Sequence, residues 1–219
     1  ILVDALAGLH AAHELRDDDG LLLDLVHRDF SPQNILVGTD GVTRLTDFGV
    51  AKASGRVNVT SSGIIKGKVA YMAPEQALGK RVDRRCDVWA AGVVAWEILA
   101  GQRLYRSEDQ VAMLLKIVNE PPPRVSSIRP DIPKELDDVV ASALTMDVDQ
   151  RCSSADELRR RVADAWKSAG GLADTHEVSE FVQATARNKI DARREQVSRV
   201  IRLRGSLAQV SAAATHAAT

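Results

Sequence analysis

The feature that most constrains this chain is the segment at residues 27–34, which reads HRDFSPQN. An apolar run and an Asp40-Gly41 turn follow it, and the chain then reaches Asp47. This order predicts a small β-hairpin with Asp29, Asn34 and Asp47 spaced around it. A carboxylate on a rigid loop can orient a hydroxyl and accept its proton, while amide and carboxylate oxygens suit Mg²⁺. Phosphoryl transfer needs such a set, because the nucleophile must be oriented and metal ions must neutralise the phosphate charge.

Three motifs in order make the chain resemble the protein kinase family. Residues 27–34 are followed by Asp47-Phe48-Gly49 and then by Ala73-Pro74-Glu75, which is the order of that family's signature. Two further landmarks fit, since residues 87–92 look like the start of the family's central helix and Arg151 precedes its last core helix. The resemblance covers residues 1–168, and the wording YMAPEQ at 71–76 looks most like bacterial serine/threonine kinases.

The resemblance implies the C-terminal lobe of a kinase domain, a mainly α-helical bundle whose short β-hairpins carry the catalytic and metal-binding loops. Hydrophobic periodicity favours helices over 2–15, 86–100, 107–119, 133–145 and 153–168, and short β-type runs at 25–26, 35–37 and 42–45. We expect three regions: the lobe at 1–168, an extension at 169–204 that is helical over about 176–204, and a disordered Ala/Ser/Thr-rich tail at 205–219.

The resemblance also implies roles for individual residues. Asp29 would be the catalytic base, Asn34 and Asp47 would bind Mg²⁺ and with it ATP, and Leu36 would form the floor under the adenine ring. The remaining roles are structural: a hydrophobic spine of His27 and Phe48, an anchor for the catalytic-loop amides at Asp87, and a buried ion pair of Glu75 with Arg151.

Arg28, just before the catalytic Asp, implies regulation by phosphorylation. Kinases of this type use that arginine to bind a phosphate on the activation loop, which here runs over 47–75. Thr60, Ser61 and Ser62 are the candidate phosphosites, because a phosphate of about −1.5 to −2 charge would pair with Arg28 and order the segment. The alternative is that this Ser/Thr cluster is only a flexible linker.

The chain lacks the parts that hold ATP from the other side of a kinase cleft. No glycine-rich loop, strand lysine or partnering helical glutamate precedes the catalytic loop, so the N-terminal lobe is absent from these residues. The sequence also begins at Ile1 without a Met, and we expect a fragment that is inactive by itself, taken from a parent that transfers phosphate from ATP to Ser or Thr hydroxyls of proteins. The alternative is a pseudokinase or scaffold that acts by protein binding. A tyrosine kinase is disfavoured, since the sequence between Asp29 and Asn34 lacks the Ala-Ala-Arg or Arg-Ala-Ala motif of that group.

Charge, hydropathy and cysteine content exclude several other classes of protein. Lys and Arg number 29 against 30 Asp and Glu, so the net charge of −1 gives no global attraction to nucleic acid. The most apolar stretch, 89–100, is interrupted by Glu97 and is too short to span a bilayer. Cys86 and Cys152 form neither a disulfide framework nor a zinc site. These features predict a cytoplasmic segment, although the parent could be membrane-anchored elsewhere.

Two groups of side chains are best interpreted as structural. Trp89, Trp96 and Trp166 lie in helical patterns and predict core positions. His10 and His13 sit on one amphipathic pattern and predict surface or core-edge positions rather than metal ligands.

Two departures from the family generate a test. Most serine/threonine kinases carry a lysine two residues after the catalytic Asp and a threonine after the loop glycine, whereas this chain has Ser31 and Lys68. We hypothesise a swap in which Lys68 restores the ammonium beside the transferring phosphate from the opposite side. In the full-length enzyme, Lys68→Thr is expected to lower turnover sharply, and adding Ser31→Lys is expected to rescue it. Simple additivity of the two changes in steady-state assays would rule out the swap.

Overall fold

The computed structural model describes residues 1–48, 69–107 and 109–216. The expectations for Thr60, Ser61, Ser62 and Lys68 fall outside these residues. The longer elements are α1 (Leu2–His13), β1 (Ile35–Val37), β2 (Thr43–Leu45), α2 (Pro74–Ala77), α3 (Arg85–Ala100), α4 (Gln110–Asn119), α5 (Lys134–Ala143), α6 (Ala155–Ser168) and α7 (Thr175–His216). Short 3-10 turns occur at Pro32–Asn34, Val69–Tyr71, Val125–Ser127 and Val148–Gln150. The expected mainly α-helical body with a small hairpin is confirmed.

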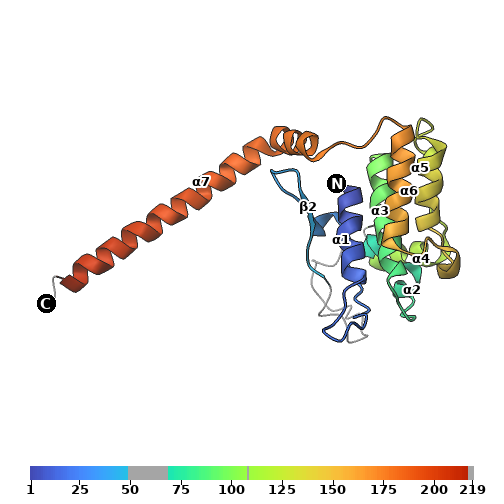
Figure 1. Ribbon diagram of the computed structural model, residues 1–219, viewed down its shortest axis with the longest axis horizontal. Coiled ribbons are helices and arrows are strands. Elements are labelled where there is room, and N and C mark those ends of the chain that lie inside the picture. The colour runs from blue at the N-terminus through green and yellow to red at the C-terminus, as the bar shows by residue number, and fades with distance from the viewer. Residues whose placement is uncertain (49–68, 108, 217–219) are drawn as a thin grey trace.

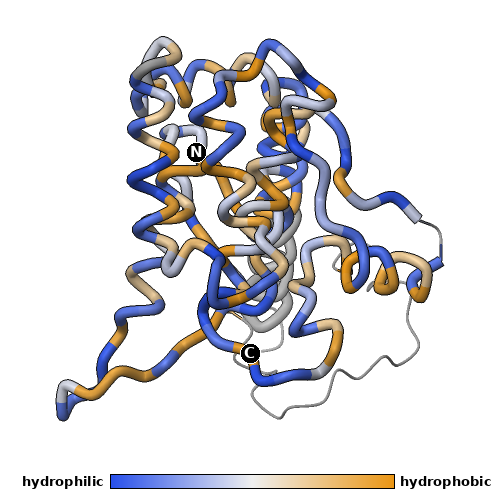
Figure 2. The backbone as a smooth tube through the Cα atoms, turned by 90° about the vertical axis from the view of Figure 1, so that its right-hand side faces the viewer, coloured by the Kyte–Doolittle hydropathy of each residue, from blue (hydrophilic) through white to orange (hydrophobic). Residues whose placement is uncertain are grey.

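The helix α3 forms the centre of the body. It is buried from Cys86 through Trp96, and a helix that is apolar on every side belongs in a core. Gly92 allows close packing, because a Cβ there would come within 2.9 Å of the Ala143 Cβ of α5. The helix α6 packs against α1, α5 and α3, and α5 also packs against α3 (Figure 1). Hydrophobic and hydrophilic stretches alternate along the chain (Figure 2).

Glu97, the charge that interrupts the apolar stretch of α3, is fully accommodated. Its carboxylate accepts hydrogen bonds from the Tyr71 hydroxyl at 2.9 Å and from the Leu104 amide at 3.2 Å. Arg103 pairs with the same carboxylate at 3.1 Å. Burial, together with the neighbouring Glu97 carboxylate, raises the pKa of Tyr71. This network ties the segment before α2 to the central helix.

Local signals set the helix ends. The Asp109 carboxylate accepts a hydrogen bond from the Val111 amide, so α4 begins at Gln110 rather than at 107 as expected. The Ser154 hydroxyl accepts from the Glu157 amide, so α6 begins at Ala155 rather than at 153. The proline run at 121–123 lies between α4 and α5.

Two structural expectations were wrong. Residues 25–26 are not a strand, because a two-residue apolar run with no partner strand cannot form a ladder. The nearest strand-like pairing is an isolated bridge between Arg16 and Leu22. The segment from 205, expected to be disordered, is helical as far as His216. It lacks an apolar period, but its alanines have the highest intrinsic helix propensity and need no packing to favour a helix.

The helix α7 leaves the body and points away from it (Figure 1), but its first turns contact the hairpin. The Ser179 hydroxyl and the Gln183 side-chain amide both donate to the Thr39 carbonyl, at 2.7 and 3.1 Å. Gly41, in the same hairpin turn, has a φ of +77°, and a Cβ there would lie 2.0 Å from the Thr175 carbonyl oxygen. Among the described residues, no helix is both long and apolar enough to cross a membrane.

This contact predicts the outcome of a glycine substitution. Gly41→Ala should separate the start of α7 from the hairpin, since the new methyl group has no space beside Thr175. Hydrogen exchange of the amides at 175–183 should become faster. Gly20→Ala is the matched control, because Gly20 has a φ of +79° but no atom lies within 4 Å of the position that a Cβ would take, so it shares the backbone strain without the clash. Equal exchange rates in both variants would contradict the contact.

Candidate active site

The loop at 27–31 is held by one buried carboxylate. Asp87, in the first turn of α3 and 1% exposed, accepts hydrogen bonds from the His27 amide at 2.8 Å and the Arg28 amide at 2.7 Å. The Nε2 atom of His13, from α1, lies 2.8 Å from the same carboxylate. Arg28 adopts a φ of +60°, a conformation that costs a non-glycine residue energy and persists only where its surroundings hold it. Asp87 therefore fixes the backbone that presents Asp29.

His27 links this loop to the segment before Asp47. Its ring is fully buried, with Nδ1 3.2 Å from the Asp29 amide and Nε2 3.1 Å from the Thr46 carbonyl. The amide donates to Nδ1, so these contacts fit the tautomer with the proton on Nε2. The ring also packs against Phe48 in a tilted arrangement, with centroids 4.6 Å apart and ring planes at 50°. The expected neighbours His27 and Phe48 are thus in contact.

The hairpin brings Asn34 and Asp47 to the same end of two paired strands. Ile35 pairs with Leu45, so the residues just outside that pair meet, and the Thr46 amide donates to the Asn34 carbonyl at 2.9 Å. The side-chain amide of Asn34, 3% exposed, donates to the Asp29 carbonyl at 2.7 Å. Asp47 is exposed and has a φ of +58°. Asp29, Asn34 and Asp47 therefore belong to one connected backbone unit.

Two neighbouring predicted site residues differ in exposure. Leu36 projects from β1 and is 52% exposed, so an apolar side chain faces outward beside the hairpin end. Ser31 is buried, and its hydroxyl has no hydrogen-bond partner among the described residues. A buried hydroxyl without a partner costs about 1–3 kcal/mol, so this atom is a place where a further polar group would be favourable.

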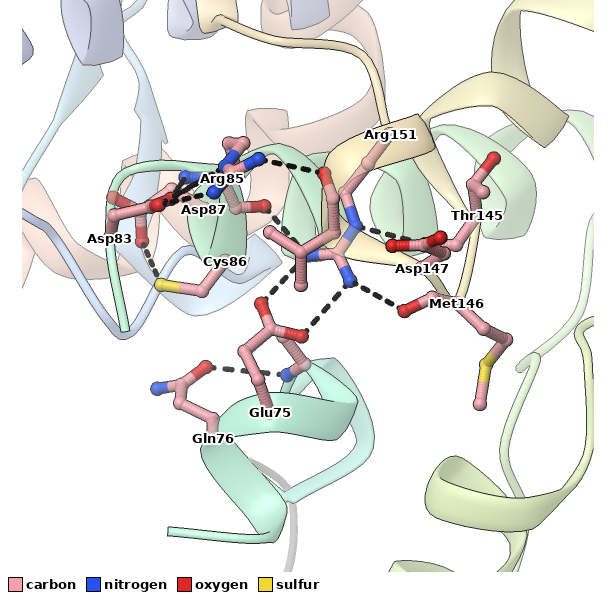
Figure 3. A network of polar contacts seen from close by, with 12 residues as sticks. Glu75, Gln76, Asp83, Arg85, Cys86, Asp87, Thr145, Met146, Asp147 and Arg151 are labelled. Carbon is pink, nitrogen blue, oxygen red and sulfur yellow. Dashed lines mark hydrogen bonds and ion pairs between the residues drawn. The ribbon is translucent and has the colours of Figure 1, made fainter. Parts of the chain in front are cut away.

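The second anchor of the site is an ion pair between α2 and the turn before α6. Arg151 donates to both carboxylate oxygens of Glu75, at 2.7 and 3.0 Å (Figure 3), and its side chain is 0% exposed. The guanidinium also donates to the carbonyls of Thr145 and Arg85, each at 3.0 Å, and lies 5.0 Å from the Trp89 ring centroid. The Arg151 guanidinium is thus compensated by a carboxylate and by backbone carbonyl oxygens, as burial of its charge requires.

Two contributors to the site were missed by sequence reasoning. Gln76, beside Glu75, donates to the Arg28 carbonyl at 3.3 Å and accepts from the Ala73 amide at 3.3 Å, so it joins α2 to the loop at 27–31. His13 is buried against Asp87, where a surface or core-edge position was expected. The periodicity of α1 placed His13 on a helix, but no local signal identifies a partner in α3.

The cysteines show no sign of reactivity. Cys86 and Cys152 are both buried and unpaired. Burial raises the pKa of the Cys86 thiol, and the nearby Asp87 carboxylate adds to that effect, so the thiolate is disfavoured. Within the described residues, no cluster of three or more His, Cys, Asp or Glu side chains could hold a metal ion.

The chain is similar to known proteins over much of its length. The family model described as "Protein kinase domain" matches residues 1–162. "Tyrosine-protein kinase MasK" of Myxococcus xanthus is 42% identical over 158 residues, which are 71% of this chain and 24% of that protein. "Probable serine/threonine-protein kinase PknB" of Lactococcus lactis is 35% identical over 139 residues, 64% and 22% of the two chains. "Serine/threonine-protein kinase PknL" of Mycobacterium tuberculosis is 34% identical over 155 residues, 71% and 37%. The chain therefore spans between a fifth and two fifths of the length of these relatives.

The buried ion pair predicts a large stability effect. Arg151→Met leaves the Glu75 carboxylate buried without its partner and should lower the free energy of unfolding by about 3–5 kcal/mol in urea denaturation. Arg129→Met breaks an exposed pair with Asp131 and should cost less than about 1 kcal/mol. The double variant Glu75→Gln with Arg151→Met removes both charges, so it should recover part of the stability lost in Arg151→Met. The loss that remains reports the other contacts of the arginine. Equal costs for the Arg151 and Arg129 variants would contradict the assignment.

Proposed function

This chain belongs to the protein kinase family, and on that premise we propose that the protein containing it transfers the γ-phosphate of ATP to serine or threonine hydroxyls of other proteins. The observation that carries the proposal is the single unit formed by Asp29, Asn34 and the segment leading to Asp47. A scaffold that had lost catalysis would not need all three residues. Their joint retention favours an enzyme over the pseudokinase alternative.

The Asp29 carboxylate acts as the base in this proposal. It accepts the proton of the acceptor hydroxyl while the hydroxyl oxygen bonds to the γ-phosphorus and the bond from that phosphorus to the β–γ bridging oxygen breaks, so ADP leaves. The loop must keep its shape during this step. The hydrogen bonds to Asp87 and the Asn34 contact to the Asp29 carbonyl support that requirement.

Asn34 and Asp47 would hold Mg²⁺. Their donor set is one amide and one carboxylate, which fits a hard cation that usually keeps several waters and binds substrate phosphates. The exposure of Asp47 fits the same use, since the ion must face the nucleotide. When bound, Mg²⁺ neutralises charge on the phosphates. Leu36, exposed and apolar on β1, would contact the adenine ring.

The absence of a partner for the Ser31 hydroxyl among the described residues supports the Lys68 swap hypothesis. An ammonium delivered from the activation segment would satisfy this buried oxygen as well as a phosphate oxygen.

Arg28 and the hydroxyls of Thr60, Ser61 and Ser62 remain a proposed phosphate-dependent switch.

The acceptor has a second candidate, the tyrosine hydroxyl. One observation favours it, namely that the relative at 42% identity is named a tyrosine-protein kinase. The loop wording between Asp29 and Asn34 favours serine and threonine instead. The chemistry at Asp29 is the same for either acceptor, so the product must be identified directly.

A transfer assay tests the proposal. The full-length protein that contains this chain, given radiolabelled ATP, Mg²⁺ and a protein substrate, should produce phosphoserine or phosphothreonine on amino-acid analysis. Asp29→Asn should lower the rate about 100-fold or more, because the base is lost while the side-chain shape is kept. Asp24→Asn is the matched control, an exposed carboxylate five residues earlier, and should change the rate little. Phosphotyrosine alone would establish the second acceptor, and no transfer would leave the scaffold alternative.

We expect the 219-residue chain alone to show no transfer. It lacks the glycine-rich loop and the strand lysine that cover the phosphates in this family, so ATP would rest on one wall of its site.

A further inference from the structure

The charge of this chain is distributed very unevenly. Residues 187–202 of α7 contain six Lys and Arg and two acids, a net charge of +4, whereas the whole chain carries −1. The rest of the molecule therefore carries a net charge of −5. Such an asymmetry gives α7 its own electrostatic preference for an anionic partner.

The apolar residues of this part of α7 gather on one side. With about 100° per residue, Ile190, Val197 and Ile201 fall within about 40° of one another, and we call these three residues the α7 stripe. Val197 and Ile201 are 47% and 65% exposed, and Val200, beside the stripe, is 63% exposed. No described element covers this face, because α7 extends beyond the body (Figure 1).

Three cations border the stripe, and both acids lie farther from it. Arg193 lies along one edge, about 60° from the centre of the stripe, and Arg194 and Arg187 lie along the other, at about 40° and 60°. Asp191 and Glu195 lie about 100° or more from the centre of the stripe, and Arg194 makes only a loose, exposed contact of 3.9 Å with Asp191. An amphipathic helix with basic edges and a polar far side is the pattern that lies on anionic lipid, with its cations at the headgroups.

This arrangement disfavours a second copy as the occupant. Two stripes packed face to face would bring Arg193 and Arg194 of one helix against the same cations of the other, in either direction of packing. An anionic bilayer instead presents negative charge along both edges at once. We propose that α7 docks through its stripe and basic edges on a bilayer that contains anionic lipid such as phosphatidylserine.

Vesicle flotation of the 219-residue chain tests the proposal. Binding to phosphatidylcholine vesicles with about 30% phosphatidylserine should exceed binding to pure phosphatidylcholine at least about tenfold at about 0.1 M salt, because each cation near the surface contributes roughly a fivefold gain. The double variant Arg193→Glu with Arg194→Glu should weaken binding to charged vesicles by at least about tenfold.

The chain offers a matched control on the far side of the helix. Arg199→Glu with Arg202→Glu makes the same change in net charge at positions about 120–180° from the stripe, and should weaken binding no more than about threefold. Circular dichroism should show equal helicity in both variants. Equal losses in the two variants, or no binding of the parent chain to charged vesicles, would overturn the proposal. Self-association that rises with concentration and is lost only in the stripe-edge variant would assign the face to a second copy and would also overturn it.

Discussion

The buried carboxylate of Asp87 is the contact on which the candidate active site depends. It accepts hydrogen bonds from two backbone amides of the loop at 27–31 and contacts the imidazole of His13, so α3, α1 and the loop meet at one charge. A carboxylate this deeply buried is tolerable only when its oxygens are hydrogen-bonded. The same bonds that make the charge tolerable also hold Arg28 in its strained conformation. The burial of the Asp87 carboxylate and the geometry of the loop therefore depend on the same hydrogen bonds.

The ion pair of Glu75 with Arg151 extends that constraint to the other side of the loop. Glu75 lies in a short helix that could not be stable alone, and Gln76 of the same helix reaches the Arg28 carbonyl. Arg28 is thus held through its amide by Asp87 and through its carbonyl by Gln76. Both anchors trace back to α3, because Arg151 also bonds to the Arg85 carbonyl and packs on Trp89.

The sequence predicted the parts of this site that have local or motif signals. The Asp40-Gly41 turn between two β-type runs placed Asn34 and Asp47 around a hairpin, and the family resemblance supplied the contacts of Glu75 with Arg151 and of Asp87 with the loop amides. The catalytic roles of these residues remain predictions. The contacts of His13 and Gln76 could not be predicted, since each joins residues 48 or more positions apart without a pattern that pairs them. The helix beyond 204 was missed because the lack of an apolar period shows only that a segment does not pack, whereas intrinsic propensity decides whether it is helical.

The helix α7 connects the hairpin to the proposed lipid-binding face. Ser179 and Ile190 are 11 residues apart, which is about 16 Å along the axis and only about 20° around it, so the hairpin and the stripe lie on the same side of the helix. A flat surface laid along the stripe would meet the hairpin where Thr39 contacts Ser179. The stripe begins at Ile190, so the hairpin contact and the lipid compete for one face only where the surface extends past Ile190 toward the start of α7. Where they compete, linkage requires that loosening the hairpin from α7 favours docking, and that docking favours release of the hairpin that lies between Asn34 and Asp47.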